Sequence, residues 1–360
     1  MTHLSPIVLA IAFAALVVAL TALARRLPVP TPILQVAAGL IIGMVPGVKI
    51  PDLDPDLVFF VFLPPILWSA AFFTSVRDFK ANIRAIGWLA VGLVLATTLV
   101  VALTARAFVP GMPWAVAIAL GAIISPPDAV AAVAIVSRLP VPARVVTILE
   151  GESLVNDASA LVLYRAAIAA AVTGQFSWGA TIVRFFIDAI VGVLVGMLVA
   201  WLIIRAMRWT KDALAETVLT LVGPYVAWVA AERLHVSAVL ACVAGGIYLR
   251  QHFSTAVGAM SRLQTRNVWE LLLFLLNALI FLLLGEQFTE LIPRVPAGEL
   301  GAVIRLGITV AAVAIVVRLV WVPLVTVVPR MMKRRARRDL PAIRWKNVSL
   351  VAWTSMRGIV

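Results

Sequence analysis

Apolar runs of about 20 residues recur along the chain, and short stretches rich in proline, glycine and charge separate them. A helix that spans a membrane needs about 20 such residues. The pattern predicts twelve segments: 5–24, 32–48, 57–75, 83–105, 113–137, 143–174, 178–204, 214–231, 236–249, 267–289, 298–327 and one that begins near 345. We therefore expect an all-α polytopic membrane protein in which residues 1–360 form one transmembrane domain, without a soluble domain.

The composition agrees with this pattern and excludes other classes of protein. Hydrophobic residues make up 63% of the chain and charged residues only 13%, whereas a soluble globular protein has about 25% charged residues. The net charge of +13 comes from basic residues between the apolar segments, so no nucleic-acid partner is predicted. The single Cys242 and three scattered histidines offer neither a disulfide framework nor a metal-ligand spacing, and we predict no cofactor.

The basic residues also predict how the chain is oriented. Most of the 30 Lys and Arg residues lie in the odd-numbered loops, and the even-numbered loops hold only Lys49, Arg106, Arg233 and Arg294. Loops rich in Lys and Arg stay in the cytoplasm. The sequence therefore predicts a multi-pass protein of the plasma membrane with its N-terminus outside.

The fifth segment is expected to break in the middle. Pro126 and Pro127 have no backbone N–H, so the carbonyls of Ala122 and Ile123 lose their helical partners, and Asp128 follows at once. Such a break at membrane depth is tolerated where it is buried in protein or lines a wet cavity. Two interpretations remain: a proline kink whose aspartate accepts from nearby N–H groups, or a discontinuous helix that coordinates a cation through its carbonyls and carboxylate.

The sixth segment carries three carboxylates into an apolar run: Glu150, Glu152 and Asp157. At 100° per residue, Glu152 and Asn156 share one stripe of the helix, and Ser153 and Asp157 share the next. Together with the aspartate of the broken helix, these oxygens suit an alkali cation. The alternative, a polar helix end at the membrane surface, fits Glu150 better than Asp157.

Arg318 lies among apolar residues, too far from either end of its segment to reach water easily. A buried arginine needs an anion, and Glu152 is the candidate because their pairing cancels two charges that are costly to bury. A second cation, Arg357, lies in the last segment. We expect Arg357, Pro126 and Pro127 to line the same cavity.

These residues resemble the monovalent cation/proton antiporter family 1, the NhaP-type and NHE-type sodium/proton exchangers. The sequence Gly-Glu-Ser-Leu-Val-Asn-Asp at 151–157 is similar to the Asn-Asp signature of that family. Further stretches that resemble its helices are 63–67, 125–131, 274–285, the buried Arg318 and 356–358.

The resemblance implies a thirteen-helix, usually dimeric fold of two inverted repeats, with a dimerisation bundle and a mobile core bundle. Twelve of the thirteen helices are visible, and residues 1–360 are then one transport domain that stops within the twelfth helix. In the family the aspartate, here Asp157, carries the cation or protons, and the glutamate, here Glu152, pairs with the buried arginine. Many members carry an acidic residue where this chain has Ser69.

The sequence thus predicts a secondary antiporter that exchanges Na⁺, or another monovalent cation such as Li⁺, for H⁺. Exchange is expected to be electroneutral, with cation and proton competing at Asp157. A K⁺/H⁺ antiporter would use the same residues and stays open, as does a membrane sensor or scaffold that transports nothing. An intramembrane protease is not indicated, because the sequence has no Gly-x-Gly-Asp or His-Glu-x-x-His motif.

Overall fold

The computed structural model describes residues 6–27, 29–45, 55–127, 142–173, 178–296, 298–334 and 345–354, and these are almost entirely helical. Each of the twelve predicted segments contains at least one helix, which confirms the all-α prediction. The helices are α1 (Pro6–Ala24), α2 (Thr31–Gly43), α3 (Pro55–Phe73), α4 (Val76–Gly87), the π turn η1 (Trp88–Gly92), α5 (Leu93–Phe108), α6 (Trp114–Ile124), α8 (Ala143–Thr173), α9 (Trp178–Thr210), α10 (Ala213–Arg233), α11 (Ala238–Ala256), α12 (Ala259–Leu291), the 3₁₀ turn η2 (Ile292–Arg294), α13 (Leu300–Arg334) and α14 (Trp345–Thr354).

The described part of the chain holds six helical stretches that are long and apolar enough to cross a membrane. Four shorter apolar helices accompany them, in α1, α2, α3 and α6. The chain is accordingly a multi-pass membrane protein. The six long stretches are Val76–Phe108, Arg144–Val172, Phe186–Thr210, Ala213–Arg233, Ala259–Arg294 and Leu300–Val327.

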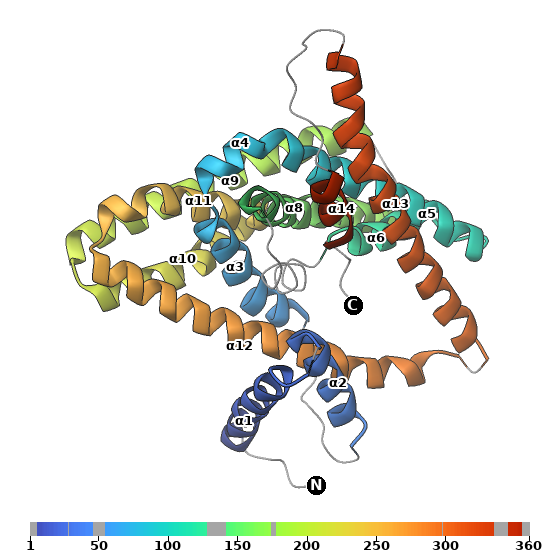
Figure 1. Cartoon of the computed structure of the whole chain (residues 1–360), viewed down its shortest axis with the longest axis horizontal. Coiled ribbons are helices and arrows are strands. Elements are labelled where there is room, and N and C mark those ends of the chain that lie inside the picture. The colour runs from blue at the N-terminus through green and yellow to red at the C-terminus, as the bar shows by residue number, and fades with distance from the viewer. Residues whose placement is uncertain are drawn as a thin grey trace.

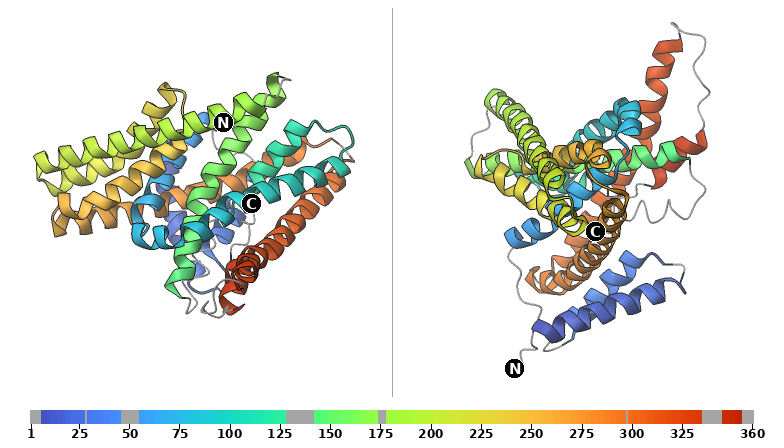
Figure 2. Two further views of the ribbon diagram at one scale, coloured as in Figure 1. Left: turned by 90° about the horizontal axis from the view of Figure 1, so that it is seen from above. Right: turned by 90° about the vertical axis from the view of Figure 1, so that its left-hand side faces the viewer.

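The helices pack as two groups that are joined side by side (Figure 1). The scaffold group consists of α3, α9, α10, α11 and α12, and the site group consists of α4, η1, α5, α6, α8, α13 and α14. The hairpin of α1 and α2 lies apart from both groups except along α12, on which α2 packs (Figure 2). Contacts of α8 with α3 and α11 connect the two groups.

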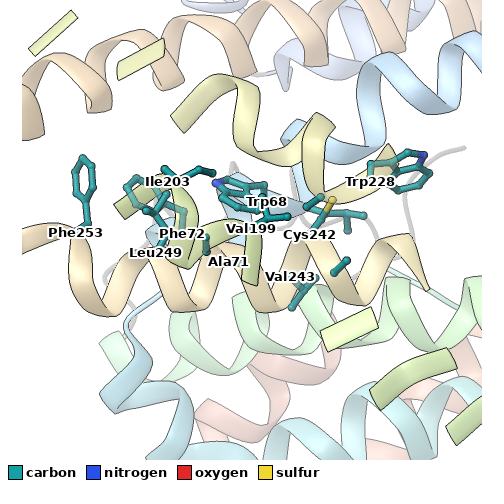
Figure 3. Packing of buried hydrophobic residues seen from close by; sticks show 14 of the residues in the cluster. Trp68, Ala71, Phe72, Val199, Ile203, Trp228, Cys242, Val243, Leu249 and Phe253 are labelled. Carbon is teal, nitrogen blue, oxygen red and sulfur yellow. The ribbon is translucent and has the colours of Figure 1, made fainter. Parts of the chain in front are cut away.

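The core of the scaffold group is built around the indole of Trp68 on α3, which is fully buried (Figure 3). The neighbouring helices present glycines to this ring. A Cβ atom at Gly245 on α11 would lie 2.4 Å from the ring, and one at Gly223 on α10 would lie 3.0 Å from it. The two glycines therefore make the room that the Trp68 indole needs.

Gly192 and Gly196 bring α9 against α11 within one chain. A Cβ atom would lie 2.6 Å from the carbonyl oxygen of Ser237 at Gly192 and 2.0 Å from that of Ala241 at Gly196. The sequence pattern predicts such close packing of small residues in membrane helices but does not say which helix is the partner. The partner in this structure is α11, so this pair does not point to contact with a second copy.

The helix predicted at 83–105 begins seven residues earlier, at Val76, and runs through α4, η1 and α5. Ser75 caps it by accepting from the backbone N–H of Asp78. The added residues are too charged to look like a membrane segment, but Asn82 and Ile86 are buried on one face and α4 packs on α8. Tertiary packing therefore extends this helix beyond its apolar run.

Replacing Gly196 with alanine tests the close contact of α9 and α11. Because the new methyl group would meet backbone rather than a flexible side chain, we expect a destabilisation of about 1–3 kcal/mol or more. The matched control is Gly307→Ala on α13, where nothing lies within 4 Å of the new atom. The midpoint of thermal unfolding in detergent should fall for Gly196→Ala alone. Equal midpoints for the two variants would contradict the assigned contact.

Candidate functional site

The first part of the site is the end of α6, where the sequence predicts a break. The helix ends at Ile124, and Ser125 is fully buried at its C-terminus. The backbone N–H and the hydroxyl of Ser125 both donate to the carbonyl oxygen of Ala122, at 3.4 Å and 3.0 Å. The helix ends where the two prolines predict, and the Ala122 carbonyl, which has no helical partner in Pro126, accepts from Ser125 instead.

The two prolines that follow the break are at least partly shielded from solvent. Pro126 is half-buried and Pro127 is buried, and α6 packs along α8. Asp128, the predicted ligand from this helix, lies outside the described residues. Arg357, which the sequence assigns to the same cavity, also lies outside them.

The second part of the site is a polar stripe near the midpoint of the 31-residue helix α8. Glu152, Ser153 and Asn156 are buried, and Asp157 is partly buried. Glu150 is also only partly buried, as expected for a residue nearer the helix end. The structure therefore places the four predicted residues Glu152, Ser153, Asn156 and Asp157 on one helix, three of them buried and Asp157 partly buried.

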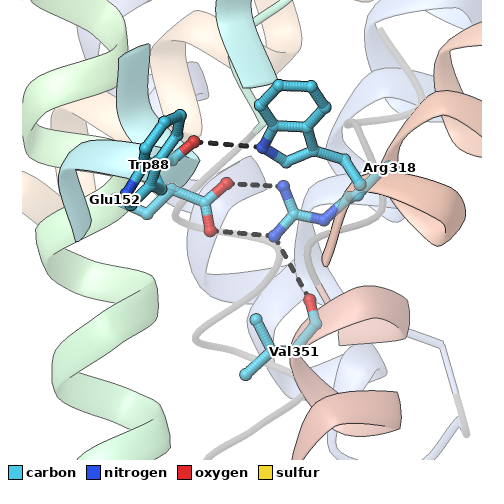
Figure 4. A network of polar contacts seen from close by, with 5 residues as sticks. Trp88, Glu152, Arg318 and Val351 are labelled. Atoms are coloured by element: carbon cyan, nitrogen blue, oxygen red, sulfur yellow. Dashed lines mark hydrogen bonds and ion pairs between the residues drawn. The ribbon is translucent and has the colours of Figure 1, made fainter. Parts of the chain in front are cut away.

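The third part of the site is a buried ion pair between α8 and α13. The guanidinium of Arg318 donates to both carboxylate oxygens of Glu152, with Nη1 at 2.5 Å from Oε1 and Nη2 at 2.8 Å from Oε2 (Figure 4). Nη2 also donates to the carbonyl of Val351 on α14, at 3.2 Å. Both charged side chains are almost inaccessible to solvent. This is the pairing that the sequence predicts, and it joins three helices at one point.

A second polar contact lies one turn further along α13. The indole N–H of Trp321 donates to the carbonyl of Trp88, at 3.1 Å, and the same carbonyl accepts from Leu93 across the π turn. A Cβ atom at Gly92 would lie 2.7 Å from the Trp321 ring. Sequence reasoning missed this contact. No pattern in the sequence predicts the π turn. Such turns are frequent at functional sites.

The side chain of Asn156 is the unusual member of the stripe. It is fully buried, and neither its amide oxygen nor its amide nitrogen has a hydrogen-bond partner among the described residues. An unsatisfied buried polar atom costs about 1–3 kcal/mol, and such atoms in native proteins call for an explanation such as a water or an ion. The amide therefore fits a role as a ligand of something that enters the site.

Ser69 on α3 is the position where the family resemblance leads one to expect an acidic residue. Its side chain is buried, and its hydroxyl donates to the carbonyl of Ile66 in its own helix, at 2.9 Å. The preceding Pro64 and Pro65 lie inside a continuous α3. Position 69 thus contributes no carboxylate, and the hydroxyl is used within α3.

Comparison with known proteins places this chain in a family. Residues 11–360 match the sequence profile described as sodium/hydrogen exchanger, transmembrane. The chain belongs to the sodium/hydrogen exchanger family. That family consists of transporters, which agrees with the prediction that the chain is not an enzyme.

Individual relatives agree with the family profile. A Mycobacterium tuberculosis protein (strain H37Rv), described as an uncharacterized Na⁺/H⁺ exchanger, is 34% identical over 358 residues, which are 98% of this chain and 65% of that protein. The sodium, potassium, lithium and rubidium/H⁺ antiporter of Bacillus subtilis (strain 168) is 37% identical over 272 residues, which are 73% of this chain and 40% of that protein. The chain is thus shorter than both relatives.

The fold of the exchanger is shared with a solved structure. The sodium proton antiporter MjNhaP1 from Methanocaldococcus jannaschii superposes with a TM-score of 0.68, covering 96% of this chain and 84% of MjNhaP1 at 21% sequence identity. At this identity the likeness concerns the fold alone. The antiporter fold that the sequence resemblance implied is therefore confirmed.

Replacing Arg318 with alanine tests the buried ion pair. The change leaves the Glu152 carboxylate buried without its partner, which costs about 3–5 kcal/mol. We expect a large fall in the midpoint of thermal unfolding in detergent. The double variant Glu152→Leu/Arg318→Leu removes both charges and should lose less stability than Arg318→Ala. A single variant as stable as the parent would exclude a structural role for the pair.

Proposed function

We propose that the exchanger transports Na⁺, or another monovalent cation, in exchange for H⁺ at the polar stripe of α8. The observation that carries the proposal is the buried amide of Asn156, which has no partner among the described residues and stands beside the carboxylate of Asp157. A buried amide without a hydrogen-bond partner is suited to bind a ligand reversibly. Membership of the exchanger family supports the same reading.

The proposed ligands are all hard oxygen donors, which alkali cations prefer. They are the hydroxyl of Ser153, the amide oxygen of Asn156 and the carboxylates of Asp157 and Asp128. Asp157 binds the cation when it is ionised and holds a proton otherwise, so the two substrates compete for one group. We expect Pro126 and Pro127, which directly precede Asp128 in the sequence, to line the cavity of the site.

The charge arrangement supports electroneutral exchange. Both oxygens of Glu152 accept from Arg318, so the Glu152 charge is already compensated and takes no part in the competition. One Na⁺ at Asp157 then replaces one H⁺. Such a cycle moves no net charge and is therefore insensitive to the membrane potential. Moving one net charge across a potential of 100 mV would change the free energy by about 2.3 kcal/mol.

The identity of the cation has a second candidate. The Bacillus subtilis relative is named for sodium, potassium, lithium and rubidium, and an oxygen site of this kind suits any of them. A K⁺/H⁺ exchanger would use the same residues. We therefore propose Na⁺ as the first substrate and K⁺ as the alternative, to be separated by adding Na⁺, Li⁺ and K⁺ in turn.

The setting of the site is part of the proposal. Residues 1–360 act as one transport domain in the plasma membrane, with the N-terminus outside and the odd-numbered loops in the cytoplasm, as the basic residues favour. The resemblance to dimeric exchangers favours a homodimer. Light scattering of the purified protein in detergent would measure its mass and contradict the dimer if a single copy is found.

Replacing Asp157 with asparagine tests the exchanging group. The variant keeps the shape of the side chain but can neither ionise nor carry a proton, so cation-dependent proton movement in inside-out vesicles should vanish. The control is Asp78→Asn, an equivalent change at an exposed aspartate on α4, which should exchange at the parent rate. Retained exchange by Asp157→Asn would refute the site.

The same vesicle assay also tests two alternatives to the proposal: a protein that transports nothing, and an exchange that moves net charge. If the parent protein moves no protons with any of the three cations, a sensor or scaffold becomes the better interpretation. If exchange is accompanied by current across a reconstituted bilayer, the stoichiometry of one cation for one proton is wrong.

Single cysteines test the proposed orientation. Cys242 is fully buried, so a cysteine introduced in a loop is the residue that a maleimide reagent reaches. Val109 between α5 and α6 should be outside, and Arg77 at the start of α4 should be inside. We expect a membrane-impermeant maleimide to label Val109→Cys on intact cells and to leave Arg77→Cys unlabelled. The reverse labelling pattern would show that the chain has the opposite orientation.

A further inference from the structure

A groove outside the ion site lies between the C-terminal ends of α9 and α11. It has a volume of about 580 Å³. Both helices end on the side of the membrane that the basic residues assign to the cytoplasm. The side chains that line the groove are Trp201, Ile204, Arg205, Ala206, Arg208, Trp209, Tyr248 and His252.

Two arginines give the groove its charge. Arg205 and Arg208 are three residues apart on α9, so they share one face of the helix, and both are exposed. Neither forms an ion pair or a side-chain hydrogen bond with any residue that the structure describes. Their guanidinium groups can therefore bind an anion in the fork geometry that phosphate accepts.

Aromatic side chains surround these charges. Trp201 and Trp209 are 47% and 94% exposed, and the Tyr248 and His252 rings lie 4.5 Å apart. Exposed tryptophans at the end of a membrane helix are typical of the level of the lipid headgroups. The groove is thus placed at the boundary between membrane and water.

An apolar stripe leads along α9 into the groove. It consists of Ile190, Leu194, Met197, Leu198 and Trp201, all of them exposed. Their spacing of four, three, one and three residues puts them on one side of the helix. The same side continues to Arg205 and Arg208. The helix surface is therefore apolar first and then positively charged. A phospholipid has the matching order, with its apolar acyl chain followed by its charged headgroup.

We propose that this groove binds an anionic phospholipid of the cytoplasmic leaflet. The phosphate lies between Arg205 and Arg208, the tryptophans flank the glycerol region, and an acyl chain lies along the stripe from Trp201 to Ile190. A soluble phosphate would use the arginines but leave the stripe without a function, which favours the lipid. The binding is independent of which cation the exchanger transports.

The experiment compares Arg205→Gln/Arg208→Gln with the control Arg77→Gln/Lys80→Gln. The control removes the same charge from two exposed residues on the same side of the membrane. Delipidated protein in detergent is titrated with phosphatidylglycerol or phosphatidylcholine, and bound lipid is counted by native mass spectrometry. We expect the groove variant to bind phosphatidylglycerol about 30-fold more weakly than the parent, at about 1 kcal/mol per arginine. The affinity of the control variant for phosphatidylglycerol should change by less than about threefold.

Each other outcome would overturn the proposal. An equal loss of phosphatidylglycerol affinity in the two variants would mean that the lipid is attracted by the net positive charge of the protein and not by a specific site. Equal binding of phosphatidylcholine would remove the requirement for an anionic lipid. Displacement of phosphatidylglycerol by millimolar inorganic phosphate would make a soluble anion the ligand. A changed oligomeric mass with unchanged lipid binding would identify the groove as a contact between two copies.

Discussion

Two opposite charges buried near the midpoints of α8 and α13 constrain how the helices around them pack. Taking an ion out of water costs several kcal/mol even in a relaxed protein, and only good geometry with further hydrogen bonds offsets that cost. Arg318 meets most of this condition by donating to both oxygens of Glu152 and to the carbonyl of Val351, while its Nε has no partner among the described residues. Because a bidentate contact tolerates little sliding, it fixes the register of α8 against α13 and brings α14 to the same point.

The ion pair also decides what the rest of α8 can do. With Glu152 committed to Arg318, the next carboxylate along the helix is Asp157, and the intervening Asn156 has a buried side-chain amide without a partner among the described residues. At the end of α6 the Ala122 carbonyl accepts from Ser125. The site that we propose therefore uses side-chain oxygens as its cation ligands.

The sequence predicted those features that follow from charge and hydrophobicity. The positions of the helices come from the apolar runs, and the pairing of Glu152 with Arg318 comes from the cost of burying either one alone. It could not predict features that depend on which helix lies opposite. The start of the long helix at Val76 comes from packing on α8, the double donation by Ser125 depends on local rotamers, and the partner of Gly196 is known only once α11 is in place.

The two proposed sites lie in different groups of helices. Membrane helices gain little from apolar contact with each other, so small residues or polar contacts must supply close association, and both groups use both means. Gly196 brings α9 against α11 and Gly121 brings α6 against α5. Trp321 donates to the Trp88 carbonyl in the site group, and Trp269 donates to Thr220 in the scaffold group. The lipid groove lies on α9 and α11 of the scaffold group, and the ion site lies on α8 of the site group. A change at Arg205 therefore leaves the contacts of Glu152 and Asn156 intact, and its effect on lipid binding can be separated from any effect on ion exchange.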